Sequence, residues 1–293
     1  MKIGIIGSGA IGLLFGYYLQ KASAQVTMYT RTTEQAVQIR DKGVVCKRGD
    51  QEDAVFPDAQ ALDEAVLTDD YLFVAVKQYQ LESLLPCLHN SASKNIVFLQ
   101  NGMSHLSFIQ EMSDKNTAVG IVEHGAKKEG AAVVRHTGLG VAKLGVVNGT
   151  KQDFQPVFSF FSSVFPLLEE EDWRETATYK LIINACINPL TALYKVKNGE
   201  LLENEHFQEV MKQTLLETLG ALGETDEEGH WDRVCKVCRN TSANQSSMLT
   251  DILHKRPTEA DAILGYILKE AYRRNIQTPI ISFLYQSIKG LER

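Results

Sequence analysis

The sequence predicts an α/β fold in which a doubly wound parallel sheet is followed by an all-α C-terminal domain. Two observations carry this prediction. Short apolar runs alternate with helix-sized stretches in the first third of the chain, an order typical of parallel strands connected by helices. After Trp173 the apolar residues recur at helical spacing almost throughout. Because the β pattern is lost near residue 170, we expect one domain at residues 1–170 and a helical domain at residues 171–293.

The first strand is predicted at residues 2–6 and a helix at residues 13–22. A G-x-G-x-x-G motif stands between them, at the strand-to-helix junction that a Rossmann-type dinucleotide-binding domain requires. There the first glycine makes a tight turn, the second lets the pyrophosphate approach the backbone, and the third lets helix and strand pack closely. A glycine-rich turn without a ligand is the alternative. The predicted cofactor-binding residues are Gly7, Ser8, Gly9, Ala10, Ile11 and Gly12.

A second strand is predicted at residues 25–31, and its end should lie beside the adenosine ribose of the cofactor. Proteins that prefer NAD usually carry Asp or Glu there, whereas this chain has Thr30, Arg31 and Thr32. A cation flanked by hydroxyl groups is suited to a 2′-phosphate, so the sequence favours NADP(H) over NAD(H). The alternative is that Arg31 only begins a solvated helix.

Two further buried strands are predicted at residues 71–76 and 95–99. Lys77 and Gln80 follow the first of them, and Asn101 follows the second. Ligands of open parallel sheets bind outside the carboxyl ends of the strands, so we expect these three residues to lie by cofactor and substrate rather than in solvent loops. Residues 118–147 are then predicted to form antiparallel strands that extend the sheet, and residues 151–164 an amphipathic helix.

The first helix of the second half carries an unusual polar stripe. Lys180, Asn184 and Asn188 recur every fourth residue among apolar neighbours, so they share one narrow face. Asparagine is a poor helix former, and a buried amide must be hydrogen-bonded. A ligand-facing stripe is therefore favoured over an internal structural network. Pro189 is predicted to end or kink this helix just past Asn188.

The rest of the second half is predicted to be helical. At residues 258–261 the order T-x-x-D matches a helix-capping pattern, which places Glu259 in a first turn, where the helix dipole favours a carboxylate. That structural role is the alternative to a functional one. Asn198 lies in a turn, and Ser247 stands near a helix start. The predicted helices cover residues 206–222, 230–240, 246–254 and 259–275.

Composition limits the classes of partner. A net charge of -6 argues against nucleic acid, which needs clustered lysine and arginine, and favours a small molecule. The chain has no apolar run of about 18 residues and no signal peptide, so we expect a cytoplasmic protein without a membrane partner. Cys235 and Cys238 form a C-x-x-C near His230. Because a second ligand pair is missing and the segment should be helical, no metal is expected.

Together these motifs resemble the ketopantoate reductase (2-dehydropantoate 2-reductase) family. The resemblance spans nearly the whole chain and implies NADPH-dependent reduction of 2-dehydropantoate to (R)-pantoate, a step toward pantothenate and coenzyme A. It also implies a Rossmann domain joined to an all-α domain. The motifs that carry it are G-x-G-x-x-G, K-x-x-Q at residues 77–80, Q-N-G at 100–102, K-L-x-x-N-x-x-x-N-P-L-T-A-L at 180–193, N-G-E-L at 198–201 and S-S-M-L-x-D…T-E at 246–259.

The same resemblance implies roles for single residues. Lys180 would be the general acid that protonates the carbonyl oxygen, because an ammonium both stabilises the growing negative charge and supplies the proton. Glu259 would orient that lysine. Asn101 would lie between nicotinamide and substrate. The remaining implied substrate contacts are Asn184, Asn188, Asn198 and Ser247, and the implied cofactor contacts outside the glycine-rich turn are Arg31, Lys77, Gln80, Asn101 and Glu259.

Two positions depart from the family pattern. Many members have glycine where this chain has Ser104, and threonine or tyrosine where Glu123 precedes His124. Both loops border the expected nicotinamide pocket, so a reductase of the same mechanism acting on another branched 2-oxo acid is an alternative. A nucleotide-binding sensor without chemistry is another, although Lys180 and Glu259 speak against it. No sequence feature determines the oligomeric state, which leaves a homodimer open.

Overall fold

The computed structural model describes residues 1–292, and the chain divides into two compact units. Unit 1 comprises Met1–Gln100 and Leu106–Trp173. Unit 2 comprises Asn101–His105 together with the chain from Arg174 onward. The division therefore falls three residues beyond the expected position 170, and a short loop from the first half of the chain belongs to unit 2. Trp173 stays with unit 1 because its side chain packs against Gly145, where an added Cβ would lie 2.1 Å from Trp173 Cβ.

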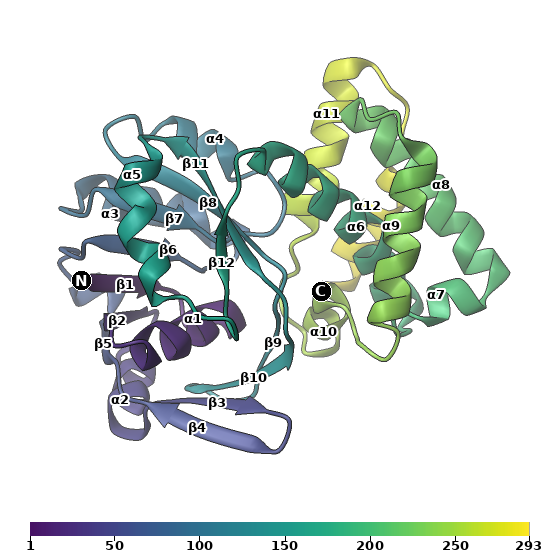
Figure 1. The fold of residues 1–293 in the computed structure, drawn as a ribbon. Helices are drawn as coiled ribbons and strands as arrows, with labels where there is room; N and C mark the ends of the chain where they lie inside the picture. The colour runs from purple at the N-terminus through teal and green to yellow at the C-terminus, as the bar shows by residue number, and fades with distance from the viewer. Residues whose placement is uncertain (293) are drawn as a thin grey trace. The chain divides into compact units, whose positions relative to one another are not determined.

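Unit 1 is built on an eight-stranded sheet with the order β12-β11-β8-β7-β6-β1-β2-β5 (Figure 1). The six strands from β5 to β8 run parallel, and β11 is antiparallel to β8. The chain direction across the sheet reverses between β1 and β6, which is the switch point of a doubly wound sheet. The strands span Lys2–Ile6 (β1), Gln25–Thr30 (β2), Asp58–Ala61 (β5), Tyr71–Val74 (β6), Asn95–Phe98 (β7), Asn116–Val122 (β8), Ala142–Asn148 (β11) and Leu167–Glu169 (β12).

Helices connect these strands, and the predicted α/β fold class is confirmed. The core of the unit consists of fully buried apolar side chains such as Ile3, Ile5, Phe15 and Phe73. The α1 helix begins directly after the glycine-rich turn. The helices of unit 1 span Ala10–Lys21 (α1), Thr33–Lys42 (α2), Leu81–Asn90 (α3), Leu106–Gln110 (α4) and Lys151–Phe154 (α5), with 3-10 turns at Leu62–Glu64 (η1), Gln78–Gln80 (η2) and Gln155–Phe160 (η3).

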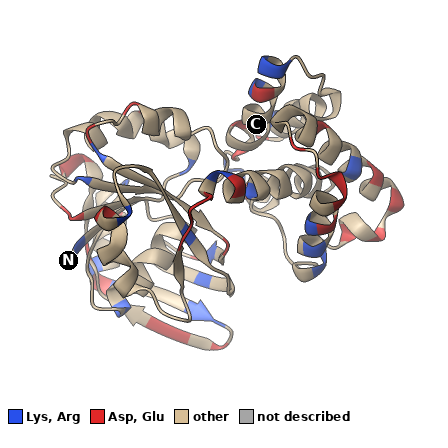
Figure 2. Cartoon of the chain, turned by 45° about the horizontal axis from the view of Figure 1, so that its top comes forward, with Lys and Arg blue, Asp and Glu red and all other residues tan. Residues whose placement is uncertain are grey.

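Residues 118–147 do not all extend the main sheet, and the strand that joins β7 there, β8, is parallel to it rather than antiparallel, so that prediction is partly wrong. Two of their strands, β9 (Gly125–Lys128) and β10 (Val133–Gly138), join β3 (Val44–Arg48) and β4 (Gln51–Val55) in a separate four-stranded sheet of order β4-β3-β10-β9. The outer strand β4 is almost wholly exposed and polar, which explains why its pattern predicted no strand. Figure 2 shows basic and acidic residues together on this small sheet.

The single amphipathic helix predicted at residues 151–164 is also wrong. The α5 helix stops at Phe154, and a 3-10 segment continues to Phe160. Pro156 has no backbone N–H to donate to a helical carbonyl, and the aromatic rings that follow it pack into the core instead of along one helix face. Phe161 and Phe165 stack with ring centroids 5.7 Å apart.

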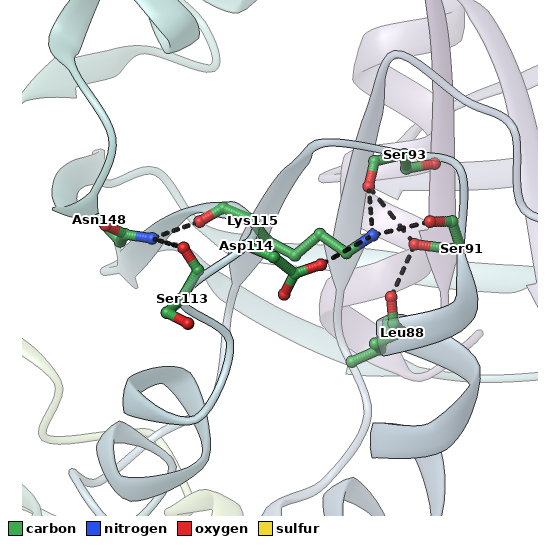
Figure 3. A network of polar contacts seen from close by, with 7 residues as sticks. All are labelled: Leu88, Ser91, Ser93, Ser113, Asp114, Lys115 and Asn148. Atoms are coloured by element: carbon green, nitrogen blue, oxygen red, sulfur yellow. Dashed lines mark hydrogen bonds and ion pairs between the residues drawn. The ribbon is translucent and has the colours of Figure 1, made fainter.

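A buried lysine connects the segments at one end of strands β7, β8 and β11 (Figure 3). The side chain of Lys115 is only 3% exposed, and its Nζ donates to the carbonyl oxygens of Ser91 at 2.7 Å and Ser93 at 3.3 Å. Asn148 Nδ2 donates to the Lys115 carbonyl at 2.5 Å. Asp114 lies 3.9 Å from the ammonium. This network satisfies the buried charge and joins the end of α3 to the neighbouring strands.

Unit 2 is helical, as expected from the sequence, and no helix among residues 1–292 is long and apolar enough to cross a membrane. One helix at its C-terminal end, α12, was not among those predicted. The helices span Trp173–Tyr194 (α6), Glu200–Glu203 (α7), Glu205–Leu222 (α8), Glu227–Asn240 (α9), Ser247–Leu253 (α10), Tyr266–Arg274 (α11) and Pro279–Leu291 (α12), with a π-helical turn at Asp261–Gly265 (η4).

Two local predictions in unit 2 are corrected. Of the two outcomes predicted at Pro189, an end of the helix is wrong: α6 continues to Tyr194, because Leu190 and Ala192 are fully buried and keep this turn packed. Asp261 does not complete a capping box at Thr258. Its carboxylate accepts bonds from Tyr285 Oη at 2.6 Å and Lys289 Nζ at 3.0 Å instead.

Candidate active site

The glycine-rich turn of unit 1 has the geometry that its sequence motif requires. Gly7 has a φ of +102°, a conformation that strongly favours glycine. Its backbone N–H donates to the Tyr29 carbonyl at 2.9 Å and so anchors the turn on β2. A Cβ at Gly12 would lie 1.8 Å from the Gly7 carbonyl oxygen. Glycine at both positions therefore lets α1 start directly against the end of β1.

The start of α1 is suited to a phosphate group. Gly9 is the N-cap residue, and a Cβ there would meet only the Ala75 carbonyl oxygen, 4.0 Å away. The first turn, which includes Ala10 and Ile11, carries no acidic residue. Its backbone N–H groups and the helix dipole favour an anion. The Ser8 hydroxyl is buried without a hydrogen-bond partner, so a ligand oxygen at this turn would satisfy it.

Lys77 and Gln80 lie at the carboxyl end of β6, beside the glycine-rich turn. Both are half-buried, and the 3-10 turn η2 is closed by the Gln80 N–H donating to the Lys77 carbonyl at 2.9 Å. Gln100 Nε2 donates to the carbonyls of Val74 at 2.9 Å and Val76 at 3.1 Å. This buried glutamine thus sets the path of the loop that carries Lys77. The sequence motif Q-N-G contained it, but nothing in the sequence indicated its role.

Arg31 is exposed directly after β2. The flanking hydroxyl groups are engaged within the protein: Thr30 Oγ1 donates to the Thr32 carbonyl at 2.8 Å, and Thr32 Oγ1 accepts from the Gln35 N–H at 3.3 Å as the cap of α2. The Thr32 hydroxyl thus caps α2 and the Thr30 hydroxyl donates within the protein, while the expected 2′-phosphate site at this strand end stays a prediction. The guanidinium of Arg31 is the accessible cationic group at this strand end.

The loop Asn101–His105 is held on the helices of unit 2. Asn101 Nδ2 donates to Glu259 Oε2 at 3.0 Å. Gly102 has a φ of +76°, and a Cβ there would lie 2.2 Å from the Ala262 carbonyl oxygen. Thr178 Oγ1 lies 3.8 Å from Met103 Sδ. These contacts bring Asn101 to the buried carboxylate of Glu259 and to α6 near Lys180.

His105 is a further residue at this position, and it was not among the predicted site residues. Its side chain is buried, and burial lowers the pKa of the imidazole to about 4, with Glu259 opposing and Lys180 reinforcing that shift. The electrostatic influence of both residues on His105 means that the three titratable groups share one neighbourhood. The sequence offered only one signal for it, a histidine close behind Q-N-G.

The polar stripe of α6 passes from a partly exposed part of the helix into a buried one. Lys180 and Asn184 are partly exposed, whereas the neighbouring residues Leu181, Ala185 and Cys186 are buried. Asn188, one turn farther on, is 8% exposed. The first two polar side chains of the stripe are thus partly exposed, and the third is buried.

Asn198 and Ser247 lie at the other end of α6, on either side of the loop that precedes α10. Asn198 Nδ2 donates to Thr241 Oγ1 at 2.9 Å, while its Oδ1 atom is buried without a hydrogen-bond partner. Ser246 caps α10 by accepting from the Leu249 N–H at 3.0 Å and is bonded to Thr191 of α6 at 2.7 Å. Ser247 is left exposed at the first turn.

His124 follows Glu123, one of the two positions that depart from the family pattern, and belongs to a hydrogen-bonded chain in unit 1. Its Nδ1 atom accepts from the Gly140 backbone N–H at 3.2 Å, so the 3.1 Å contact with His136 Nε2 requires His136 to donate. His136 Nδ1 must then accept from Tyr18 Oη at 2.8 Å. Burial lowers the pKa of His124 to about 4 and also lowers that of His136. Both imidazoles are thereby held neutral, each in one tautomer.

The C-x-x-C cysteines lie on α9 and are buried. Burial raises the pKa of both thiols, that of Cys238 to about 12. Within residues 1–292 no three His, Cys, Asp or Glu side chains are grouped so that they could hold a metal ion. Both side chains belong to the packed interior of unit 2.

Models of one protein family match both halves of the chain. The C-terminal model of ketopantoate reductase PanE/ApbA matches residues 172–292, and the ketopantoate reductase PanE/ApbA model matches residues 3–149. The chain belongs to the ketopantoate reductase family. A 2-dehydropantoate 2-reductase of Bacillus subtilis (strain 168) is 44% identical over 296 residues, which cover 100% of this chain and 98% of the relative. The resemblance seen in the sequence is thus confirmed.

Solved structures agree with this assignment. The crystal structure of a probable 2-dehydropantoate 2-reductase from Bacillus subtilis matches with a TM-score of 0.89 at 43% identity and covers 99% of this chain and 100% of that one. A D-mandelate dehydrogenase bound to NADH and anilino(oxo)acetate matches with a TM-score of 0.91 at 21% identity, covering 100% of this chain and 98% of that one. At that identity the likeness concerns the fold alone.

Proposed function

We propose that this member of the ketopantoate reductase family is an NADPH-dependent oxidoreductase that reduces 2-dehydropantoate to (R)-pantoate, toward pantothenate and coenzyme A. The observation that carries the proposal is the 44% identity to a 2-dehydropantoate 2-reductase along the full length of both chains. The arrangement of Asn101, Glu259 and Lys180 in unit 2 supports it.

NADPH fits the residues of unit 1. The buried Ser8 hydroxyl without a partner, the open side of Gly9 and the acid-free first turn of α1 match a pyrophosphate. Arg31 supplies the cation for the 2′-phosphate, and no carboxylate follows β2 directly to repel it. Lys77 and Gln80 add polar groups at the neighbouring strand end. When bound, NADPH supplies the hydride that reduces the 2-oxo carbon.

Lys180 acts as the general acid. As the substrate carbonyl becomes an alcohol, negative charge grows on its oxygen, and the ammonium of Lys180 stabilises that charge and donates the proton. Glu259 orients this lysine. Asn101, bonded to Glu259 at 3.0 Å, holds the carboxylate in one orientation.

The amides and hydroxyl of unit 2 bind the substrate. Asn184 lies on the accessible stripe of α6 one turn from Lys180, and Asn188 follows one turn later. The buried Oδ1 of Asn198 lacks a partner and can accept a bond from the substrate hydroxyl. Ser247 is exposed at the start of α10 and can donate to the substrate carboxylate.

A spectrophotometric assay tests the proposal. NADPH consumption is followed with 2-dehydropantoate as substrate, and NADH is run in parallel. We expect turnover with a higher kcat/KM for NADPH than for NADH. Binding of NADPH without turnover of any 2-oxo acid would instead indicate a nucleotide sensor and would contradict the proposed reaction.

A second candidate substrate is another branched 2-oxo acid. Ser104 and Glu123 stand where family members often carry other residues. The Ser104 hydroxyl, in the same loop as Asn101, lies 3.5 Å from the Ala262 carbonyl oxygen. A panel of branched 2-oxo acids distinguishes the two candidates, because a higher kcat/KM for another acid displaces 2-dehydropantoate. Sedimentation of the purified protein tests whether it forms a homodimer.

A further inference from the structure

Three segments of unit 1 meet at the Ser8 carbonyl, within the glycine-rich turn. Lys128 Nζ donates to this oxygen at 2.8 Å from the end of β9. Gln35 Nε2, in the first turn of α2, lies 3.4 Å from the same oxygen and donates to the Ala131 carbonyl at 2.7 Å. The small sheet and α2 are thereby tied to the turn that starts α1.

The position of Lys128 is set by the small sheet rather than by the main one. In β9, Lys128 pairs with Val134 of β10, and the Val134 side chain is fully buried. Strands β9 and β10 both pack against α1 (Figure 1). Side chains alternate between the two faces of a strand, so half-buried Lys128 lies on the α1 side and its neighbour Lys127 is exposed.

This arrangement adds a full positive charge to a turn that otherwise offers only backbone dipoles. Dinucleotide-binding turns hold the pyrophosphate through backbone N–H groups and the helix dipole. Here a lysine ammonium is in hydrogen-bond contact with the residue between Gly7 and Gly9. Ser8 is only 6% exposed, and its hydroxyl is buried without a partner. The cation thus contacts the same residue that carries this buried hydroxyl.

We propose that Lys128 is a cofactor-binding residue whose ammonium holds the Ser8 carbonyl and neutralises the pyrophosphate of the dinucleotide. The small sheet then serves as the element that delivers this charge. The pyrophosphate is favoured over the adenosine 2′-phosphate because Ser8 lies inside the turn, whereas the 2′-phosphate belongs at Arg31, after β2. The inference rests on the proposed NADPH-binding function.

The test compares cofactor affinity in variants of the full-length protein. Lys128→Gln retains a donor for the Ser8 carbonyl but removes the charge, Lys128→Arg retains the charge, and Lys127→Gln is the matched control on the same strand. Dissociation constants for NADPH and NADH are measured by titration calorimetry without substrate. Because a charge-assisted contact is lost, we expect Lys128→Gln to weaken both cofactors by about tenfold or more and by a similar factor. Lys128→Arg and Lys127→Gln should stay close to wild type.

Other outcomes overturn the inference in distinguishable ways. If Lys128→Gln binds both cofactors with wild-type affinity, the charge of Lys128 takes no part in cofactor binding. If this variant loses affinity for NADPH alone, Lys128 acts on the 2′-phosphate and not on the pyrophosphate. A loss shared by Lys128→Arg and Lys128→Gln, with lowered melting temperatures, assigns the lysine a purely structural role. If the wild-type protein binds neither cofactor, the proposed function fails together with this inference.

Discussion

Asn101 and Glu259 are 158 residues apart in the chain, yet Asn101 Nδ2 donates to Glu259 Oε2 at 3.0 Å. The bond lies in unit 2, because the loop Asn101–His105 clusters with the helices and not with the sheet that precedes it. Glu259 is buried, and the oxygens of a buried carboxyl group need hydrogen-bond donors. Asn101 supplies one of them.

A double-mutant cycle tests this pair. We expect Asn101→Ala and Glu259→Gln each to lower kcat/KM, and the double variant to lose less than the sum, with a coupling free energy of about 0.5–3 kcal/mol. The exposed amide–carboxylate pair Gln213 and Glu209 on α8, bonded at 2.9 Å, is the matched control and should show no coupling in turnover. Additive losses for Asn101 and Glu259 would show that the bond has no part in catalysis.

Replacement of Lys180 tests its proposed role as general acid. In Lys180→Ala we expect kcat to fall by about 10²- to 10⁴-fold, the usual contribution of a positioned acid, while NADPH still binds. Steady-state kinetics and cofactor titration measure the two effects separately. Lys212→Ala, at an exposed position of α8, is the control. Unchanged turnover in Lys180→Ala would falsify the assignment.

Cofactor preference should depend on Arg31. Arg31→Gln removes the accessible cation after β2, so we expect the KM for NADPH to rise by about 10- to 100-fold, as for a lost charge-assisted bond, with little change for NADH. Lys42→Gln, exposed at the end of α2, should alter neither value. An equal loss with both cofactors would place Arg31 away from the 2′-phosphate.

The neutral histidine chain of unit 1 predicts acid sensitivity. The pKa of His124 is lowered from 6.5 to about 4 in the folded protein, so the unfolded chain binds more protons between these values. The neutral His124 side chain therefore contributes to the free energy of unfolding, fully so above pH 6.5. This contribution, at most about 3 kcal/mol, is lost as the pH falls toward 4. His105 acts in the same direction in unit 2.

Melting temperatures across this pH range measure the effect. His124→Asn places an amide oxygen near the position of Nδ1 that can still accept from Gly140 but cannot be protonated. We therefore expect a shallower fall of the melting temperature with acid than in wild type, and no change of slope for His206→Asn at an exposed position. A slope identical to wild type in His124→Asn would mean that this imidazole is not held neutral by the fold.

Features that depend on local spacing could be predicted from the sequence. The positions of Gly7 and Gly12 follow from a turn that six consecutive residues define, and the structure has the strand, turn and helix at those places. The stripe of Lys180, Asn184 and Asn188 follows from the helical period alone. The parallel strands β1, β6 and β7 were recognisable because strands buried on both faces are apolar along their whole length. The partly polar strand β5 was not predicted, and β8, which was expected to be antiparallel, pairs parallel with β7.

Features that depend on pairing between distant segments were decided by the tertiary structure. Strand β3 pairs with β10, which lies far from it in the chain, and Lys128 contacts Ser8. The α6 helix continues past Pro189 because its next turn is buried. Local periodicity reports which face of an element is apolar. It does not report which distant surface covers that face, because the pairing is set by burial and register over the whole fold. The sequence by itself therefore determined the fold class and the family's motifs, while tertiary packing decided that Asn101 meets Glu259 and that His105 lies buried beside them.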